Sequence, residues 1–251
     1  QGSGVSVRIV ITPLIIFLNT HMTRIIIAGD SWGVNSYETE ELYPNLTQTI
    51  RTKKKGYFLY PGPGELLSEV TETEIINTAG RGYSNTEALD ALEEIVTKDD
   101  IVIFYQSGML REVYKAHLAG EGHHATESFA DDFIHYEDKF YERCKKIQAK
   151  SFTLIGGCVK VNVEKAEKNG INVLLPSMTS WMHPDFVDNE FDTTVYWLEY
   201  QYSCSDFKNA VIESHKKIEF WVESDHFIKR HPTVRTNRRL IKDILLTHIT
   251  S

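Results

Sequence analysis

Short apolar runs that alternate with amphipathic segments constrain the fold of this chain more than any other feature of its sequence. Five such runs lie in the segments RIIIAG (24–29), EIINTAG (74–80), DDIVIFY (99–105), FTLIGG (152–157) and INVLLP (171–176). Apolar residues recur at helical spacing in 85–98, 127–150, 206–224 and 234–249. Strands of this length separated by helices form right-handed crossovers around a buried parallel sheet. The pattern predicts a three-layer α/β/α sandwich with a mainly parallel five-stranded sheet.

The length of 251 residues is compatible with one domain that buries a sizeable core. We expect a single domain over residues 22–251, because no repeat or low-complexity linker interrupts it. The preceding residues 1–21 end in Thr20-His21, directly before Met22, and are interpreted as a leader or a cloning-derived segment. Their apolar run at 7–18 is interrupted by Pro13 and is too short to span a bilayer, so no membrane association is predicted.

Charge and cysteine content exclude several function classes. The net charge of −8 argues against a general nucleic-acid binder, because phosphate neutralisation requires clustered Lys and Arg. The segment 53–65, KKKGYFLYPGPGE, is predicted to be a polar loop rich in Gly and Pro. The three cysteines are widely spaced and indicate reduced thiols, which favours a cytoplasmic location and leaves secretion open. No pattern indicates an oligomeric state.

The residues that directly follow the strands are the first candidates for a site, since open α/β sheets bind ligands beyond the carboxyl ends of their strands. Gly29-Asp30-Ser31 follows the first predicted strand, where it is either a helix cap or an exposed hydroxyl. The turn NTAGRGYSN (77–85) follows the second, with Ser84 or Asn85 as the helix cap. Its glycines can expose backbone N–H groups that stabilise an oxyanion. Near the C-terminus, His231 precedes Pro232 and is a plausible general base.

Taken together, these three segments resemble the SGNH, or GDSL, hydrolase family. The family carries its nucleophile in Gly-Asp-Ser after the first strand, an oxyanion donor in an N-x-A-x-x-G-x-S-N turn, and its base in a C-terminal His-Pro. The matching residues here are Gly29-Asp30-Ser31, then Asn77, Ala79, Gly82, Ser84 and Asn85, then His231-Pro232-Thr233. The resemblance covers residue 23 to the C-terminus and implies a flavodoxin-like sheet and a serine hydrolase that needs no metal and no cofactor.

Two positions depart from the pattern of this family. The family's third block supplies an oxyanion-hole asparagine, but IVIFYQSGMLRE (101–112) contains none, which leaves Gln106 or Ser107 as substitute donors. The family also places its acid three residues before the histidine, where this chain has Ile228. Asp225, six residues before His231, is the candidate acid, with Glu223 as a weaker substitute. Asp30 and Asn85 are interpreted as supporting residues.

Other polar and aromatic stretches favour less specific interpretations. His117, His123 and His124 lie in a Gly-rich segment without zinc-ligand spacing and are predicted to belong to a loop. A second His-Pro pair at His183 is a rival base, but no helix follows it as one follows His231. The aromatic segment around Tyr196 is either a carbohydrate platform or part of the core.

The resemblance implies an esterase that acts through a serine acyl-enzyme. Ser31 is the expected nucleophile and His231 the expected base, with Asp225 as the acid. The expected oxyanion donors are Gly82 and Gln106 or Ser107. The implied partner is a small-molecule or glycan ester, such as an O-acetyl group on a carbohydrate. Two alternatives stay open at this point, namely a catalytically weakened binding module and an O-acyltransferase.

Overall fold

The computed structural model describes residues 23–34, 36–39, 53–54, 57–109, 111–112, 129–157, 160–182, 227–228, 231–232 and 234–250. Five of the described strands form one parallel sheet in the order β5-β1-β6-β7-β8. Their bounds are β1 (Ile25–Gly29), β5 (Ile75–Asn77), β6 (Ile101–Gln106), β7 (Ser151–Gly156) and β8 (Asn172–Leu175). All five coincide with the predicted apolar runs, so the predicted sheet is confirmed.

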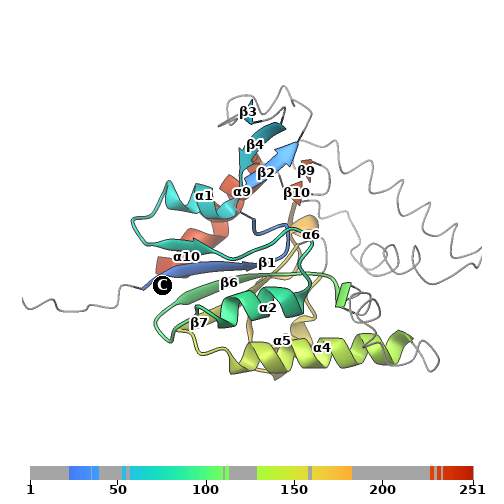
Figure 1. The fold of residues 1–251 in the computed structure, drawn as a ribbon. Helices are drawn as coiled ribbons and strands as arrows, with labels where there is room; N and C mark the ends of the chain where they lie inside the picture. The colour runs from blue at the N-terminus through green and yellow to red at the C-terminus, as the bar shows by residue number, and fades with distance from the viewer. Residues whose placement is uncertain are drawn as a thin grey trace, which may run out of the picture.

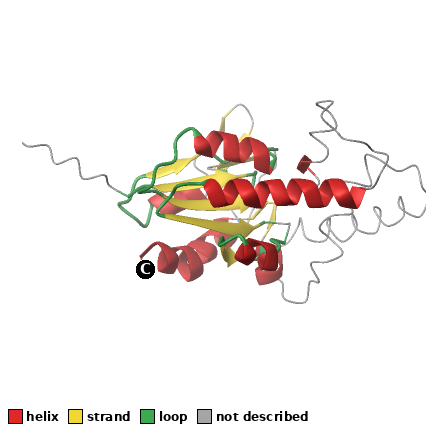
Figure 2. Ribbon diagram, turned by 90° about the horizontal axis from the view of Figure 1, so that it is seen from below, coloured by secondary structure: helices red, strands yellow, loops and turns green. Residues whose placement is uncertain are grey.

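Helices cover both faces of this sheet (Figure 1). One face carries α2 (Asn85–Glu93), α4 (Phe129–Lys146) and α5 (Val163–Lys168). Figure 2 shows α4 running across it. The other face carries α1 (Pro63–Ser68) and a C-terminal helix made of α9 (Val234–Leu240), the π-helical turn η3 (Ile241–Leu245) and α10 (Leu246–Thr250). This confirms the three-layer sandwich and the helices predicted at 85–98, 127–150 and 234–249. The helix predicted at 206–224 and the leader at 1–21 lie outside the described residues.

The central strand β1 shows why the sequence forms a buried sheet. Ile25 and Ile27 pack into the core under the C-terminal helix, whereas Ile26 and Ala28 pack into the core under α2 and α4. All four are at most 1% exposed. A strand buried on both faces requires an uninterrupted apolar run, which is the pattern in the sequence.

A capping box fixes the start of α2. The Ser84 hydroxyl accepts from the Glu87 N–H, and the Glu87 carboxylate accepts from the Ser84 N–H. This arrangement satisfies two backbone donors at the helix start. The alternative of Ser84 or Asn85 as the cap is therefore resolved in favour of Ser84, and Asn85 becomes the first helical residue.

The prediction of a polar loop over 53–65 is wrong. β3 (Lys53–Lys54) and β4 (Tyr57–Pro61) pair antiparallel, and β2 (Ser36–Thr39) joins them on the other side of β4. The aromatic-rich run at 57–60 suits a strand, and Pro63 lies at the start of α1, where its missing N–H costs nothing. The prediction gave the Gly and Pro residues more weight than these signals. The short helix α6 (Met178–Met182) was also not predicted.

An ion pair closes the amino end of the sheet. The Arg24 guanidinium donates to both carboxylate oxygens of Asp100, at 2.9 and 2.7 Å. Burial raises the pKa of Asp100, but the hydrogen bonds from Arg24 and from the N–H and hydroxyl of Thr97 outweigh it and lower the pKa overall. These contacts join the starts of β1 and β6, so the two strands whose far ends carry the candidate site are held in register.

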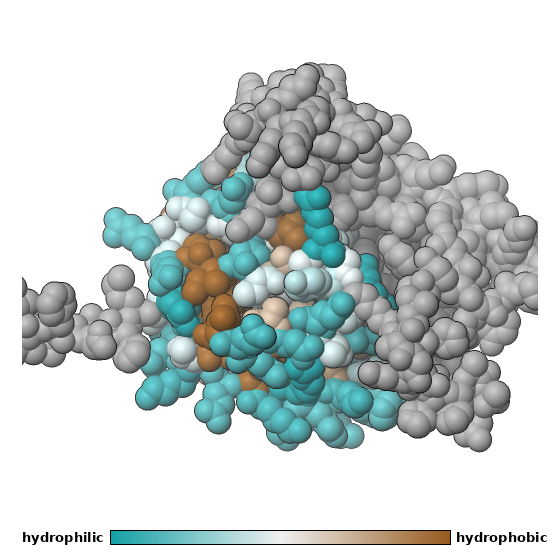
Figure 3. Space-filling model, viewed as in Figure 1, coloured by the Kyte–Doolittle hydropathy of each residue, from teal (hydrophilic) through white to brown (hydrophobic). Residues whose placement is uncertain are grey.

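The surface over the edge strand β5 is largely polar, with one apolar area in the region of α1 and β5 (Figure 3). Val70, which follows α1, is 55% exposed, and the side chains of β5 are half-buried. An edge of three residues offers few unpaired backbone groups to another chain. Among the described helices, none has the length and the apolar character needed to cross a bilayer.

Candidate active site

The strand order reverses between β1 and β6. From β1 the chain moves outward to β5 and then returns past β1 to β6. The connections that leave β1 and β6 therefore pass over opposite faces of the sheet, and ligands bind where such connections diverge. Ser31 follows β1, and Ser107 follows β6. The predicted nucleophile and the predicted third-block donors thus lie at the strand ends where the order reverses.

The turn that carries Ser31 is anchored on both sides. Gly29 has a φ of 118°, and a Cβ there would lie 2.1 Å from the Tyr105 carbonyl oxygen, so the position requires glycine. The Asp30 N–H donates to that oxygen at 3.2 Å, and the Gly33 N–H donates to the Asp30 carbonyl at 3.1 Å. Ser31 itself is half-buried in the turn. The local backbone therefore holds the serine at a fixed position at the end of β1.

Asp30 is a structural member of this turn. Its carboxylate accepts from the Trp32 N–H at 2.9 Å and lies 3.7 Å from the Arg111 guanidinium. Only 3% of Asp30 is exposed, and this burial raises its pKa to about 6, while Arg111 and the Trp32 N–H act in the opposite direction. These contacts tie the Asp30 carboxylate to the backbone of the turn and to Arg111.

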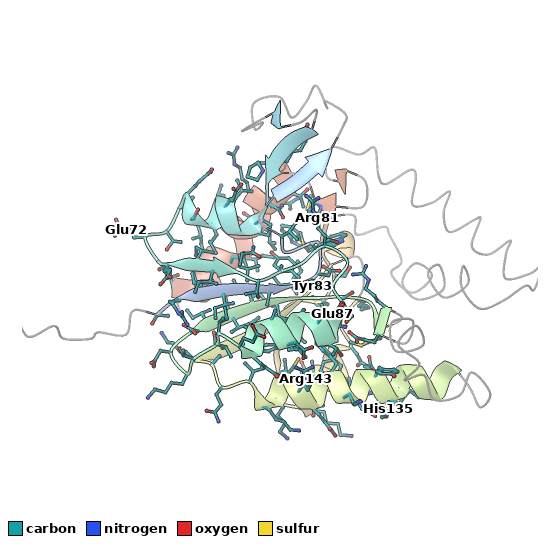
Figure 4. All side chains as sticks on the ribbon, in the orientation of Figure 1. Glu72, Arg81, Tyr83, Glu87, His135 and Arg143 are labelled. Atoms are coloured by element: carbon teal, nitrogen blue, oxygen red, sulfur yellow. The ribbon has the colours of Figure 1, made fainter. Side chains whose placement is uncertain are left out.

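The predicted oxyanion turn is joined to the serine turn by hydrogen bonds. The Asn77 amide donates to the Gly33 carbonyl at 2.7 Å, and its oxygen accepts from the Ala79 N–H. The Gly80 N–H donates to the Gly29 carbonyl at 3.1 Å. Gly82 lies exposed in the same turn with a φ of 72°, a conformation that favours glycine. Figure 4 shows Arg81 and Tyr83 of this segment at the end of the sheet to which β1 points.

Asn85 connects the start of α2 to the end of β6. Its amide nitrogen donates to the Ser107 carbonyl at 2.9 Å, and its amide oxygen accepts from the Ser107 N–H at 2.7 Å. Asn85 is 1% exposed and Ser107 is fully buried. Both backbone groups of a buried residue thus depend on one side chain, which gives Asn85 a supporting position between the second and third segments of the site.

We expect Asn85→Ala to destabilise the protein by about 2–4 kcal/mol, because it leaves a buried N–H and a buried carbonyl without partners. Urea unfolding at neutral pH measures this loss. The matched control is Asn169→Ala, since the Asn169 amide donates to the Lys165 carbonyl at the less buried end of α5. Equal losses in the two variants would contradict the role assigned to Asn85.

The substitute oxyanion donors Gln106 and Ser107 are buried at the end of β6. Gln106 is 2% exposed, and its Oε1 has no hydrogen-bond partner among the described residues. The same holds for the Ser107 Oγ, while the Ser107 N–H is already bonded to Asn85. Within the described chain, Thr78 Oγ1 and Tyr105 Oη are likewise buried and without a partner. Four of the buried polar atoms without a partner in the described chain thus belong to residues at or directly after the ends of β5 and β6, and two more belong to Asn237 of α9.

The C-terminal His-Pro segment reaches the same end of the sheet. β9 (Phe227–Ile228) and β10 (His231–Pro232) pair antiparallel, with His231 opposite Ile228 (Figure 1). Val234, at the start of α9, packs in the same core cluster as Trp32, the neighbour of Ser31. The structure thus places the His231 backbone but does not describe its side chain. The predicted acid Asp225 and its substitute Glu223 lie outside the described residues, as do His117, His123, His124, His183 and Tyr196.

Two charged residues of the site were not singled out from the sequence. The Arg111 guanidinium donates to the Tyr83 carbonyl at 2.8 Å, in addition to its contact with Asp30. Glu112 is 5% exposed and accepts from the Thr86 N–H at 2.8 Å, so it lies at the start of α2. Burial raises the pKa of Glu112, although the hydrogen bonds that its carboxylate accepts at the start of α2 act in the opposite direction. The signal in the sequence was a charged pair, Arg111-Glu112, that begins five residues after the end of a buried strand.

No metal site is formed in the part of the chain that the structure describes. Within those ranges no three His, Cys, Asp or Glu side chains gather as they do around a metal ion. Cys144 is a free, buried thiol on α4, and its burial raises its pKa well above the usual value. A buried thiol of this kind is a packing residue and not a nucleophile.

Comparisons with solved structures give alignments at low sequence identity. An acetyl xylan esterase, AlAXEase, aligns over 90% of this chain and 99% of its own, with 14% identity and a TM-score of 0.40. A protein described as a lipolytic member of the G-D-S-L family, from Desulfitobacterium hafniense DCB-2, aligns over 78% and 99%, with 12% identity and a TM-score of 0.36. A lipase/acylhydrolase from Enterococcus faecalis aligns over 80% and 97%, with 12% identity and a TM-score of 0.34. No family model matches the sequence. No curated protein matches it either.

Proposed function

We propose that the protein is a serine hydrolase that cleaves a carboxylic ester, with Ser31 as nucleophile and His231 as general base. The observation that carries this proposal is the anchored turn of Ser31 at the reversal in strand order, joined by hydrogen bonds to the turn of Gly82. A serine fixed beside an exposed glycine turn has the two parts that acyl transfer needs first, a positioned hydroxyl and a backbone donor for the oxyanion.

The reaction follows the two steps of acyl-enzyme chemistry. Ser31 Oγ attacks the ester carbonyl while His231 takes its proton, and the Ser31 and Gly82 N–H groups stabilise the tetrahedral oxyanion. The same histidine then protonates the leaving alcohol. In the second step His231 activates water, which releases the carboxylic acid and regenerates the serine. Asp225 is the proposed acid that orients the imidazole.

Gln106, which is buried at the end of β6, is the residue we favour as the third oxyanion donor. In the resembled family an asparagine side chain acts here, and the loss of one such donor costs about 2.7–4 kcal/mol of transition-state stabilisation. Gln106 ends β6, one residue after Tyr105, which pairs with Gly29 of β1, and it carries an amide at this end of the sheet. This position supports Gln106 more than Ser107, whose N–H is already engaged by Asn85.

Small acyl esters, including O-acetyl groups on a glycan, are the substrate class we propose, on the basis of the family resemblance alone. A non-catalytic binding module is the second candidate, and the absent third-block asparagine favours it. A transferase is distinguished by its products, because acetylated acceptor would accumulate faster than free acetate.

The test is hydrolysis of p-nitrophenyl acetate together with labelling by a fluorophosphonate probe. We expect wild-type protein to turn over and to carry the label on Ser31 in a mapped peptide. His231→Gln is expected to lower both rates by about 10²–10⁴-fold. His135→Gln is the matched control, because His135 is exposed on α4 (Figure 4). Folded wild-type protein that neither labels nor turns over would refute the hydrolase and support the binding module.

A further inference from the structure

Arg111 lies between the two turns that carry the proposed nucleophile and oxyanion donor. Its N–H donates to the Gly108 carbonyl at 3.0 Å, so the residue belongs to a tight turn after β6. From there its Nη1 donates to the Tyr83 carbonyl at 2.8 Å and lies 3.7 Å from Asp30 Oδ2. One guanidinium thus contacts both turns at once.

Each of these contacts is next to a residue with a proposed role. Asp30 directly precedes Ser31 and holds the Trp32 N–H. Tyr83 directly follows Gly82, and its own N–H donates to the Gly80 carbonyl at 3.2 Å. The Arg111 side chain is 24% exposed and that of Asp30 is 4% exposed. In such a partly desolvated setting, an arginine that donates in fixed directions constrains geometry more than a lysine does.

We propose that Arg111 is a positioning residue that fixes the separation of the Ser31 turn and the Gly80–Tyr83 turn, by its ion pair with Asp30 and its hydrogen bond to the Tyr83 carbonyl. The role in catalysis rests on the proposed function. The clamp, by which we mean the contacts of Arg111 with Asp30 and with the Tyr83 carbonyl, is testable without activity. Among the described residues, Arg111 is the charged side chain within ion-pair distance of Asp30. Glu112, its neighbour, faces the start of α2 instead.

A clamp through Asp30 predicts a pH-dependent effect on stability. The pKa of Asp30 is raised from 3.8 to about 6 in the folded protein, so folding is favoured while Asp30 is protonated and loses stability as the pH rises through 6. Arg111 opposes that loss. Removing its charge raises the pKa of Asp30 further, so the variant is penalised more at pH 8 than at pH 4.

The experiment compares wild type, Arg111→Met, Arg111→Lys, Asp30→Asn and the double variant Asp30→Asn/Arg111→Met by urea unfolding at pH 4 and pH 8. We expect Arg111→Met to increase the unfolding equilibrium constant at least about tenfold more at pH 8 than at pH 4. Arg111→Lys should restore part of this difference. In the Asp30→Asn background, the effect of Arg111→Met should be the same at both pH values.

Two further measurements report on the turns themselves. We expect the Gly80 amide, which bonds to the Gly29 carbonyl, to exchange its hydrogen at least about tenfold faster in Arg111→Met, and fluorophosphonate labelling of Ser31 to slow by a similar factor. Arg143→Met is the matched control, because Arg143 pairs with Asp90 and Glu93 on the α2–α4 surface.

A pH-independent loss of stability in Arg111→Met, with unchanged Gly80 exchange, would overturn the clamp. If Arg111→Met folds at pH 4 and not at pH 8, the clamp is supported. If Arg111→Met folds at neither pH, Arg111→Lys is used in its place. Its loss of stability is compared between pH 4 and pH 8, with Asp30→Asn as the reference. A wild-type protein that shows the pH-dependent coupling but takes no label would refute the hydrolase and leave the clamp intact.

Discussion

Replacing Ser31 by alanine is expected to abolish fluorophosphonate labelling and to lower the rate of p-nitrophenyl acetate hydrolysis by at least about 10⁴-fold. The expected size follows from the acyl-enzyme mechanism, in which the covalent bond forms at this oxygen and no other group takes its place. The fold should be unaffected, since Ser31 is half-buried in a turn whose hydrogen bonds are made by Asp30, Trp32 and Gly33.

Steady-state kinetics and labelling followed by peptide mapping check this result, with circular dichroism and urea unfolding to verify that the variant is folded. Ser68→Ala is the matched control, because Ser68 is exposed at the end of α1 and donates to the Glu65 carbonyl. The proposal fails if Ser31→Ala retains wild-type labelling, or if the probe maps to another serine.

Gly29→Ala is expected to be the most destabilising single methyl addition at the site, at about 2–5 kcal/mol. The added Cβ meets the Tyr105 carbonyl oxygen at 2.1 Å, and the φ of 118° is outside the range that alanine adopts readily. The estimate combines about 1–2 kcal/mol for the backbone conformation with about 1–3 kcal/mol for overpacking. Because β1 and β6 cannot separate without breaking the central ladder, the clash cannot be relieved locally.

Urea unfolding of Gly29→Ala measures the loss, and Gly170→Ala is its matched control. Gly170 also has a positive φ, of 72°, but a Cβ there has no neighbour within 4 Å, and the residue lies between α5 and β8. The control should therefore lose only about 1–2 kcal/mol, the conformational part alone. Similar losses at the two positions would show that the contact with Tyr105 is relieved by backbone movement.

The sheet was predictable because each of its strands lies in a short apolar run of consecutive residues. Ile25–Ala28 are apolar without interruption, and the start of α2 carries Ser84 and Glu87 at capping-box spacing. The antiparallel pair β3 and β4 was missed because Gly and Pro residues surround a strand of only five residues. In that segment two local signals conflict, and packing decides between them.

The site was predictable only where its chemistry is local in the chain. The Gly-Asp-Ser turn and the glycine turn after β5 can be recognised from consecutive residues. The contacts of Arg111 cannot, since they join positions 28 and 81 residues apart whose proximity depends on the strand order. Asn85 shows the same limit: its amide resembles an ordinary helix-start residue until the fold brings Ser107 opposite it.

The C-terminal helix has a consequence for biosynthesis. Val234, Leu240, Ile241 and Leu245 complete the core on one face of the sheet, and the His-Pro segment directly precedes them. On the ribosome, that face stays uncovered until these four residues emerge from the exit tunnel. A chain truncated before His231 therefore lacks both the helix that covers this face and the proposed base.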